Sequence, residues 1–277
     1  DFFFLALTVA TLTHPVPPLL QVSGLTMDFG GIRALDHLDL RVRHGEIVAL
    51  IGPNGAGKTT FFNCLTGIYT PTGGDLVLTP PGREPRRLNG LKPSRITEQG
   101  LARTFQNIRL FKSMTVLENV MIGRHCRTRT GIVGAVCRGP RTRREEREIV
   151  GTSLALLERT GLADQADEVA ASLPYGAQRR LEIARALATE PLLLLLDEPA
   201  AGMNPQETAE LIELIMAIRA DGLSILLIEH DMKLVMRLSD HIFVMDYGRR
   251  IAEGTPAEVR RDPAVIRAYL GEETHDA

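Results

Sequence analysis

The chain has 277 residues, of which 44% are hydrophobic and 24% are charged, a composition typical of a globular protein with one large or two small domains. Its formal net charge of −2 argues against bulk binding of nucleic acid, so no nucleic-acid partner is expected. The three cysteines, Cys64, Cys126 and Cys137, form no C-x-x-C pair, which argues against a disulfide framework or a cysteine-based zinc site.

Residues 1–18 are predicted to be an N-terminal tail and linker. Phe2 to Leu12 is apolar, but it is far shorter than the roughly 20 residues of a membrane-spanning helix, and no basic segment of a signal peptide precedes it. Because the chain begins at Asp1, this stretch is interpreted either as the end of a fused upstream segment or as a mis-called start or floppy tail. The proline-rich residues 14–18 predict an extended linker.

A β pattern begins at Leu19 and turns at Gly30-Gly31, and residues 38–42 alternate cleanly as a strand with one solvated face. A short apolar run, residues 46–51, predicts a buried parallel strand. Residues 60–67 then predict a helix that ends in a glycine.

Between that strand and that helix lies a phosphate-binding pattern, G-x-x-x-x-G-K-[ST]. It consists of Gly52, Pro53, Asn54, Gly55, Ala56, Gly57, Lys58, Thr59 and Thr60. The glycines let the backbone approach phosphate oxygens closely, and the N–H groups at the helix start point at negative charge. Lys58 is predicted to reach the β- and γ-phosphates of a nucleotide, and the Thr59 hydroxyl to bind Mg²⁺.

The middle of the chain is predicted to be mainly helical. A strand is predicted to end at Gln106, and helical spacing resumes at residues 116–122. Residues 124–147 carry eight arginines against two glutamates, which indicates a solvated face or loop or, alternatively, a segment close to anionic lipid head groups. Residues 143–160 predict a helix with Val150, Leu154 and Leu157 on one side.

A further helix is predicted to open at residues 172–178 and to stop before Pro191. Residues 192–196 are five consecutive leucines, too few to span a membrane, and they predict another buried parallel strand. Asp197 and Glu198 follow at the exit of this strand. Two carboxylates there are costly to bury without a partner such as a hydrated metal ion.

The last third of the chain alternates again between helices and strands. Residues 204–207 predict a helix start with an asparagine N-cap, a proline at the first position and a capping-box glutamate. Residues 224–229 predict a buried strand with His230 at its exit. Residues 242–251 predict two strands around a turn, and residues 255–270 a small helical extension.

Several polar positions therefore fall where strands end or helices begin: Lys58, Thr59, Gln106, Asp197, Glu198 and His230. Ligands of open α/β sheets bind at the carboxyl ends of strands. A phosphate-binding loop together with an apolar strand that ends in Asp-Glu is the general arrangement of nucleoside triphosphatases.

The order of these elements resembles the ATP-binding-cassette (ABC) ATPases over about residues 19 to 270. GPNGAGKTT resembles their Walker A motif, RTFQ their Q-loop, LPYGAQRRLEIARAL their signature helix, LLLLLDEP their Walker B motif and IEHD their switch-histidine segment. More narrowly, FGGIRAL, RTFQNIRLF, LEIARAL, DEPAAGMNP, LLIEHDMKLVM and DPAVIRAYLGE together are similar to the branched-chain amino-acid uptake ATPases, the high-affinity Liv-type importers.

The resemblance implies an α/β P-loop NTPase fold with a RecA-like core, an antiparallel β subdomain and a helical subdomain. The ATPase domain would cover residues 19–254, with the helical subdomain at about 107–175. Residues 255–277 would form a C-terminal helical extension and a polar tail.

The resemblance also implies how ATP and Mg²⁺ are held. Lys58 and the loop backbone would hold the phosphates, and Thr59, Gln106 and Asp197 would hold Mg²⁺, Asp197 directly or through water. Glu198 would be the general base or would orient the attacking water. His230 would contact the γ-phosphate.

Further roles implied by the resemblance concern adenine and a second subunit. Phe29 would stack on adenine, although an aromatic residue there, taken alone, is more often part of a core. Gln106 would sense the γ-phosphate and join the nucleotide site to a transporter contact. Tyr175 and Gly176, at the start of the signature helix, would contact ATP held by an opposing subunit.

Two positions depart from the family pattern. Pro174 replaces the serine whose hydroxyl would bond the γ-phosphate across the dimer, so a weakened composite site is expected, since a hydrogen bond to a charged group contributes roughly 1.5–3 kcal/mol. Pro174 still suits a helix start, which would preserve the backbone donors. Asn204 occupies the position where many relatives have an aspartate.

The functional prediction is an ATP-hydrolysing subunit that powers a membrane importer of branched-chain or hydrophobic amino acids. It would lie peripherally on the cytoplasmic face of the bacterial inner membrane. Its partners would be permease subunits bound through the region after Gln106, a second ABC ATPase of the same or another kind and, indirectly, an external substrate-binding protein. The alternatives are amide or urea import, export of lipid or lipopolysaccharide, and an ATP-dependent regulatory module without a transport role.

Overall fold

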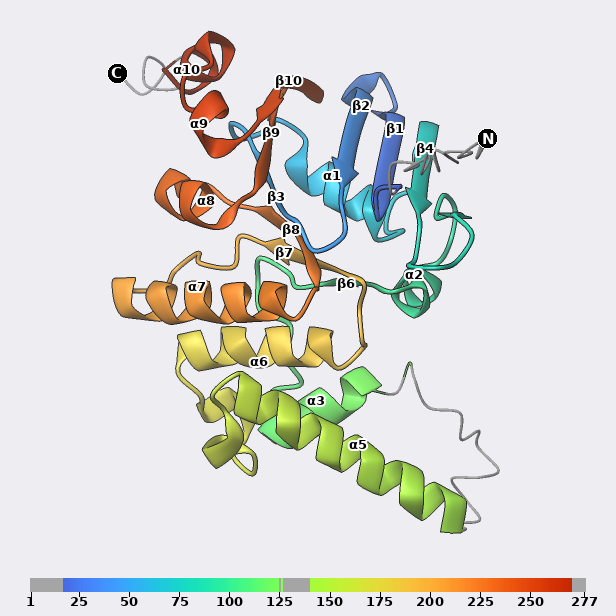
Figure 1. Cartoon of the computed structure of the whole chain (residues 1–277), viewed down its shortest axis with the longest axis vertical. Helices are drawn as coiled ribbons and strands as arrows, with labels where there is room; N and C mark the ends of the chain where they lie inside the picture. Colours follow the sequence, from blue (N-terminus) through green and yellow to red (C-terminus); the bar gives the residue numbers. More distant parts are fainter. Residues whose placement is uncertain (1–16, 125, 127–139, 271–277) are drawn as a thin grey trace, which may run out of the picture.

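The computed structural model describes residues 17–124, 126 and 140–270 (Figure 1). Most of the predicted N-terminal tail, the greater part of the basic run and the polar tail lie outside these residues. Within the described part of the chain, no helix is both long and apolar enough to cross a membrane.

The larger of two sheets has the strand order β10-β9-β3-β8-β7-β6. Its strands are β3 (Ile47–Ile51), β6 (Leu101–Arg103), β7 (Leu193–Asp197), β8 (Ser224–Ile228), β9 (His241–Asp246) and β10 (Arg249–Gly254). All neighbours pair in parallel except β10, which runs antiparallel to β9. Every residue of β3, β7 and β8 is buried, which confirms the prediction of buried parallel strands from continuous apolar runs.

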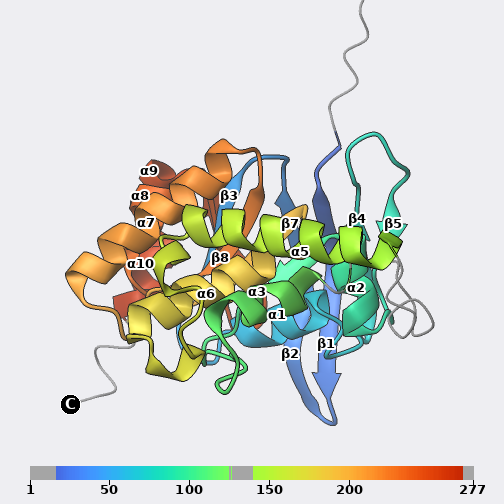
Figure 2. The ribbon, with the colours of Figure 1, turned by 90° about the horizontal axis from the view of Figure 1, so that it is seen from below.

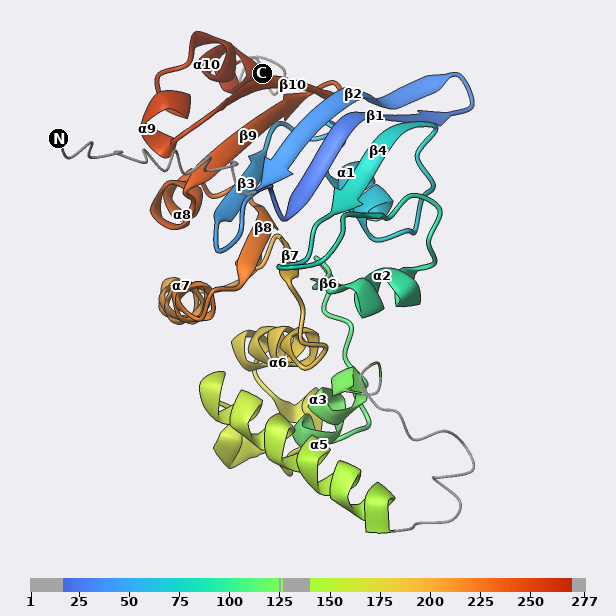
Figure 3. The same ribbon diagram turned by 45° about the vertical axis from the view of Figure 1, so that its right-hand side comes forward.

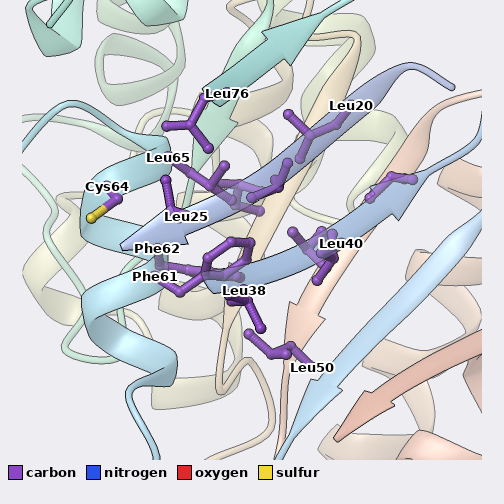
Figure 4. Close-up of a cluster of buried hydrophobic side chains, with 14 of the residues drawn as sticks. Leu20, Leu25, Leu38, Leu40, Leu50, Phe61, Phe62, Cys64, Leu65 and Leu76 are labelled. Atoms are coloured by element: carbon purple, nitrogen blue, oxygen red, sulfur yellow. The ribbon is translucent and has the colours of Figure 1, made fainter. Parts of the chain in front are cut away.

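The smaller sheet is antiparallel, with the order β2-β1-β4-β5. Its strands are β1 (Leu20–Phe29), β2 (Ile32–Val42), β4 (Gly73–Leu78) and β5 (Arg86–Arg87). Helix α1 (Lys58–Leu65) places Phe61 and Phe62 in one core with side chains from both sheets, among them Leu25 and Leu50 (Figure 4). This packing fixes the start of α1 against the end of β3.

The remaining helices lie around the larger sheet and toward the two ends of the molecule. They are α2 (Pro93–Gln99), α3 (Val116–Arg124), α5 (Pro140–Arg159), α6 (Tyr175–Leu187), α7 (Pro205–Ala220), α8 (Met232–Leu238), α9 (Pro256–Val259) and α10 (Pro263–Leu270). Helix α6 lies beside α7 (Figures 1 and 2), and α3 and α5 form the end of the molecule opposite α9 and α10 (Figure 1). Helix α6 contributes Ile183 to the core under the sheet and Leu181 to a separate core with α3 and α5.

Local signals in the sequence predicted the start of α7 correctly. The side chain of Asn204 accepts from Glu207 N at 2.9 Å, and Glu207 accepts from Asn204 N at 3.0 Å, which confirms the capping box of α7. The predicted C-terminal helical extension consists of two helices, and Pro263 begins the second of them.

Two details of the middle region differ from the prediction. Strand β6 ends at Arg103 instead of Gln106, because the chain leaves its partner β7 after Thr104 N donates to Leu195 O at 2.9 Å. On α5, Leu157 is buried as expected, but Leu154 is 40% exposed, so the apolar side of this helix is covered only in part.

Candidate functional site

The phosphate-binding loop joins the carboxyl end of β3 to the start of α1, and it depends on glycine at two points. Gly52 has φ 152°, and a Cβ atom there would lie 2.1 Å from Met245 O. Gly57, the N-cap of α1, has φ 101°, and its Cβ would lie 2.7 Å from Ala34 O. A side chain at either position would displace the loop, which explains the glycine spacing in terms of backbone conformation and close approach.

Lys58 is buried and its ammonium group lies within the loop. Its Nζ donates to Gly52 O at 2.5 Å and to Pro53 O at 2.8 Å. The loop borders a cavity of about 220 Å³, which is lined by Ala34, Asn54, Gly55, Ala56, Gly57, Lys58, Thr59, Thr60, Glu198 and His230. Backbone N–H groups at a helix start and a buried cation are suited to binding phosphate.

Glu198 joins two of the other predicted residues. Its Oε2 accepts from Gln106 Nε2 at 2.7 Å, and its Oε1 lies 2.6 Å from His230 Nε2. The three side chains follow β6, β7 and β8, which are neighbours in the sheet, so residues far apart in sequence meet at one edge. Glu198 has φ 45°, a left-handed conformation that is rare for a residue with a side chain and often marks a functional turn.

The buried carboxylate of Asp197 is paired with an arginine that the sequence analysis did not single out. Arg103 Nη2 donates to Asp197 Oδ2 at 2.7 Å, and both side chains are almost fully buried. The guanidinium lies over the rings of Phe62 and Phe105, 5.4 and 4.9 Å from their centroids. The partner that a carboxylate requires at this position is thus supplied by the chain itself.

The residues predicted to hold Mg²⁺ offer oxygen ligands of the right kind: the Thr59 hydroxyl, the Gln106 amide and the Asp197 carboxylate. Within the described residues, no group of three or more His, Cys, Asp or Glu side chains could hold a metal ion. Mg²⁺ needs no such group when it is shared with phosphate oxygens and water, so the kinds of donor fit this ion. Of the three residues, Thr59 lines the cavity, while one oxygen of the Asp197 carboxylate is bonded to Arg103.

Glu229 is a second buried acid that the sequence analysis missed, because it was assigned only to the end of a strand. Its carboxylate accepts from Ala200 N at 2.9 Å and from His230 N at 3.1 Å. Burial raises its pKa, and the two backbone donors oppose that shift. Glu229 therefore ties the turn after Glu198 to the backbone of His230. The sequence signal for this residue was its position directly after the apolar run of residues 224–228, where a carboxylate needs hydrogen-bond donors.

Several predicted site residues do not line the cavity: Gly52, Pro53, Gln106 and Asp197, and the three predicted contact residues Phe29, Tyr175 and Gly176. The Tyr175 hydroxyl donates to Ala201 O at 2.9 Å, and Gly176 N donates to Glu207 Oε1 at 3.3 Å, so both residues contact their own chain near the start of α7. Phe29 is 42% exposed at the end of β1 and meets the ring of Tyr69 edge to face, with centroids 5.2 Å apart. It is therefore not a core residue, and part of its ring is accessible.

Comparison with known proteins places these motifs in a described family. Residues 35–201 match a family model described as ABC transporter. Residues 249–275 match a second model, described as branched-chain amino acid ATP-binding cassette transporter.

Individual relatives are similar over nearly their whole length. The chain is 53% identical to the high-affinity branched-chain amino acid transport ATP-binding protein LivG of Salmonella typhimurium, over 92% of this chain and 98% of the relative. It is 50% identical to the corresponding protein BraF of Pseudomonas aeruginosa, over the same shares. Among solved structures, the ADP conformation of MJ1267, an ATP-binding cassette of an ABC transporter, matches with a TM-score of 0.79 at 31% identity, over 92% of this chain and 99% of that one.

Proposed function

The chain belongs to the ATP-binding ATPases of ABC transporters, and from this premise we propose that it powers the import of branched-chain amino acids across a membrane. The observation that supports hydrolysis most directly is the position of Glu198, which is held by Gln106 and His230 and borders the same cavity as Lys58. The cargo is inferred from the relatives, whose names specify branched-chain amino acids.

The residues of the site have separate roles: phosphate binding, Mg²⁺ binding and proton transfer. Lys58 and the loop N–H groups bind the phosphates of ATP. Thr59, Asp197 and Gln106 would hold Mg²⁺, which neutralises charge on the phosphates when it is bound. Glu198 accepts a proton from the attacking water. His230, whose Nε2 lies 2.6 Å from Glu198 Oε1, contacts the γ-phosphate.

We propose the remaining roles on the same premise. Phe29 stacks on adenine, and Tyr175 and Gly176 face ATP of a second ATPase subunit after the dimer closes. Residues 107–175 act as the helical subdomain that contacts the permease. The chain then lies peripherally at the cytoplasmic face of a bacterial inner membrane, and an external binding protein delivers the amino acid.

Hydrolysis of Mg-ATP by the purified chain, measured as a function of its own concentration, tests the enzymatic part. If two copies build the composite sites, specific activity rises with concentration and then levels off. A flat, measurable rate from a chain that sedimentation shows to be monomeric at the same concentrations would contradict assembly of two copies. The absence of hydrolysis, with or without copurified membrane subunits, would contradict the ATPase function.

Uptake by cells tests the cargo. Cells in which this chain carries Glu198→Gln should lose saturable uptake of radiolabelled leucine, isoleucine and valine, while uptake of urea and short amides continues. Loss of urea or amide uptake instead would assign the chain to another importer. Unchanged uptake of all these substrates would favour export or a regulatory role.

A further inference from the structure

We propose that a buried ion pair on α6, Arg179 with Glu182, is a positioning device that holds the Q-loop backbone so that Gln106 reaches Glu198. The two residues lie in α6, the signature helix. Both are almost fully buried, at 0% and 1% exposure. The inference rests on the proposed function, because it concerns the same hydrolysis site.

Arg179 holds the Q-loop from its carbonyl side. Its Nη1 donates to Phe105 O at 2.6 Å, and its Nη2 donates to Gln106 O at 2.7 Å. The fork of a guanidinium gives two fixed donor directions, so it restrains the orientation of both peptide units. The same guanidinium lies 3.4 Å from the hydroxyl of Tyr175.

Glu182 holds the Q-loop from its N–H side, one helical turn along α6. Its Oε1 accepts from Phe105 N at 3.4 Å and from Arg109 N at 3.2 Å, while its Oε2 bonds Arg179 Nη1 at 2.9 Å. Arg185 lies 4.0 Å from the same carboxylate. Donors and acceptors of the loop around Gln106 are thus satisfied by two side chains that also bond each other.

We call Arg179 and Glu182 together the clamp. One residue, Gln106, connects the clamp to Glu198. Gln106, whose backbone Arg179 holds, bonds Glu198 through its side chain at 2.7 Å. Tyr175 begins α6 and bonds Ala201 O, three residues beyond Glu198. Helix α6 therefore contacts both the Q-loop and the turn that follows Glu198, so displacement of α6 would move the backbone of Gln106 with it. Figures 1 and 3 show α6 between α7 and α3.

A buried ion pair is weak evidence for stability, since apolar residues of similar size often replace such pairs without loss. Apolar side chains of similar size can therefore replace the pair and test its role in positioning the Q-loop. The variant R179M/E182L keeps apolar bulk on α6 but removes the four bonds that these two side chains make to the Q-loop backbone. The control R180M removes another arginine of α6, which pairs with Glu210 of α7 at 2.7 Å and does not bond the Q-loop.

The experiment measures the equilibrium affinity for ATP, kcat for Mg-ATP hydrolysis and the thermal midpoint of the full chain. We expect R179M/E182L to bind ATP like the wild type and to remain folded at the assay temperature, with a lower thermal midpoint because four Q-loop backbone groups lose their partners. Its kcat should be lower on the order of 10²-fold, because catalysis is sensitive to small misplacements. R180M should keep its kcat. In a Q106A background, R179M/E182L should cause no further fall, because the clamp acts through Gln106.

Two outcomes would overturn the proposal: a kcat that does not change, or a loss that adds fully to that of Q106A. If the wild type does not hydrolyse ATP, the proposed function fails, and hydrogen exchange tests the clamp separately. The amides of Phe105 and Arg109 should exchange faster in R179M/E182L than in the wild type and R180M. Equal exchange in all three would contradict the clamp.

Discussion

At the scale of single residues, Glu198 is constrained in both its backbone and its side chain. It has a left-handed backbone, and its carboxylate bonds side chains that follow two neighbouring strands. Glu198→Gln should lower kcat by about 10²- to 10⁴-fold, the usual contribution of a general base, because an amide does not accept the proton of water. ATP affinity should be unchanged, because the phosphate-binding loop is intact.

Single-turnover hydrolysis and equilibrium ATP binding check this prediction. Glu213→Gln, an identical change on the exposed side of α7, serves as the control and should hydrolyse ATP at the wild-type rate. Near-normal turnover by Glu198→Gln would remove this residue from the catalytic role.

Cys64 provides a second test at this scale. It lies on α1, 2% exposed, and burial raises the pKa of its thiol to about 12. Because the thiolate is the reactive form, iodoacetamide at pH 8 should, of the two cysteines that the structure describes, modify the partly exposed Cys126 first and Cys64 only after unfolding. Mass spectrometry of labelled peptides measures both rates. Rapid modification of Cys64 in the folded chain would contradict the packing of α1.

At the scale of an element, helix α6 begins without a side-chain cap. Pro174 occupies its N-cap position and makes no capping hydrogen bond. A serine there would add a cap of about 1 kcal/mol, offset in part by about 0.4–1 kcal/mol from the more flexible unfolded chain, so stability should change little. Hydrolysis should rise, because the hydroxyl would bond the γ-phosphate of the opposing subunit, a contribution of roughly 1.5–3 kcal/mol.

Specific activity against concentration, measured for P174S, P174A and the wild type, tests this expectation. P174A lacks the hydroxyl and should not gain activity. Equal activity of P174S and P174A would show that backbone flexibility, and not a hydroxyl, changes the composite site.

At the scale of the whole molecule, Asp36 links the two sheets. It lies on β2, accepts from Arg249 Nε of β10 at 2.6 Å, and also bonds Arg33 and His37. These partners, His37 first, lower the pKa of Asp36 from 3.8 to about 2. Its contribution to stability is therefore present above about pH 4 and is lost as the pH falls through about 2.

Asp36→Asn should accordingly be less stable than the wild type at pH 7, and this difference should shrink between about pH 4 and pH 2. Urea unfolding at a series of pH values measures it. A difference that stays constant over this range would mean that ionisation of Asp36 does not stabilise the folded chain.

The sequence by itself determined the elements whose physics is local. Strand β3, the glycine loop and α1 follow one another without interruption, and the leucine run of β7 is buried because it has no polar side. The capping box of α7 spans four residues. The parallel-sheet rule then also predicted that residues at strand exits meet, as Glu198 does with Gln106 and His230.

Only the tertiary structure decided which partners balance the buried charges. Arg103 pairs with Asp197, 94 positions away, and Arg179 bonds the Q-loop carbonyls 73 and 74 positions earlier. Such pairs have no local periodicity or spacing, because they depend on how α1, α6 and the strands pack. Burial makes a charge costly without a partner, but only the assembled fold determines which side chain supplies one.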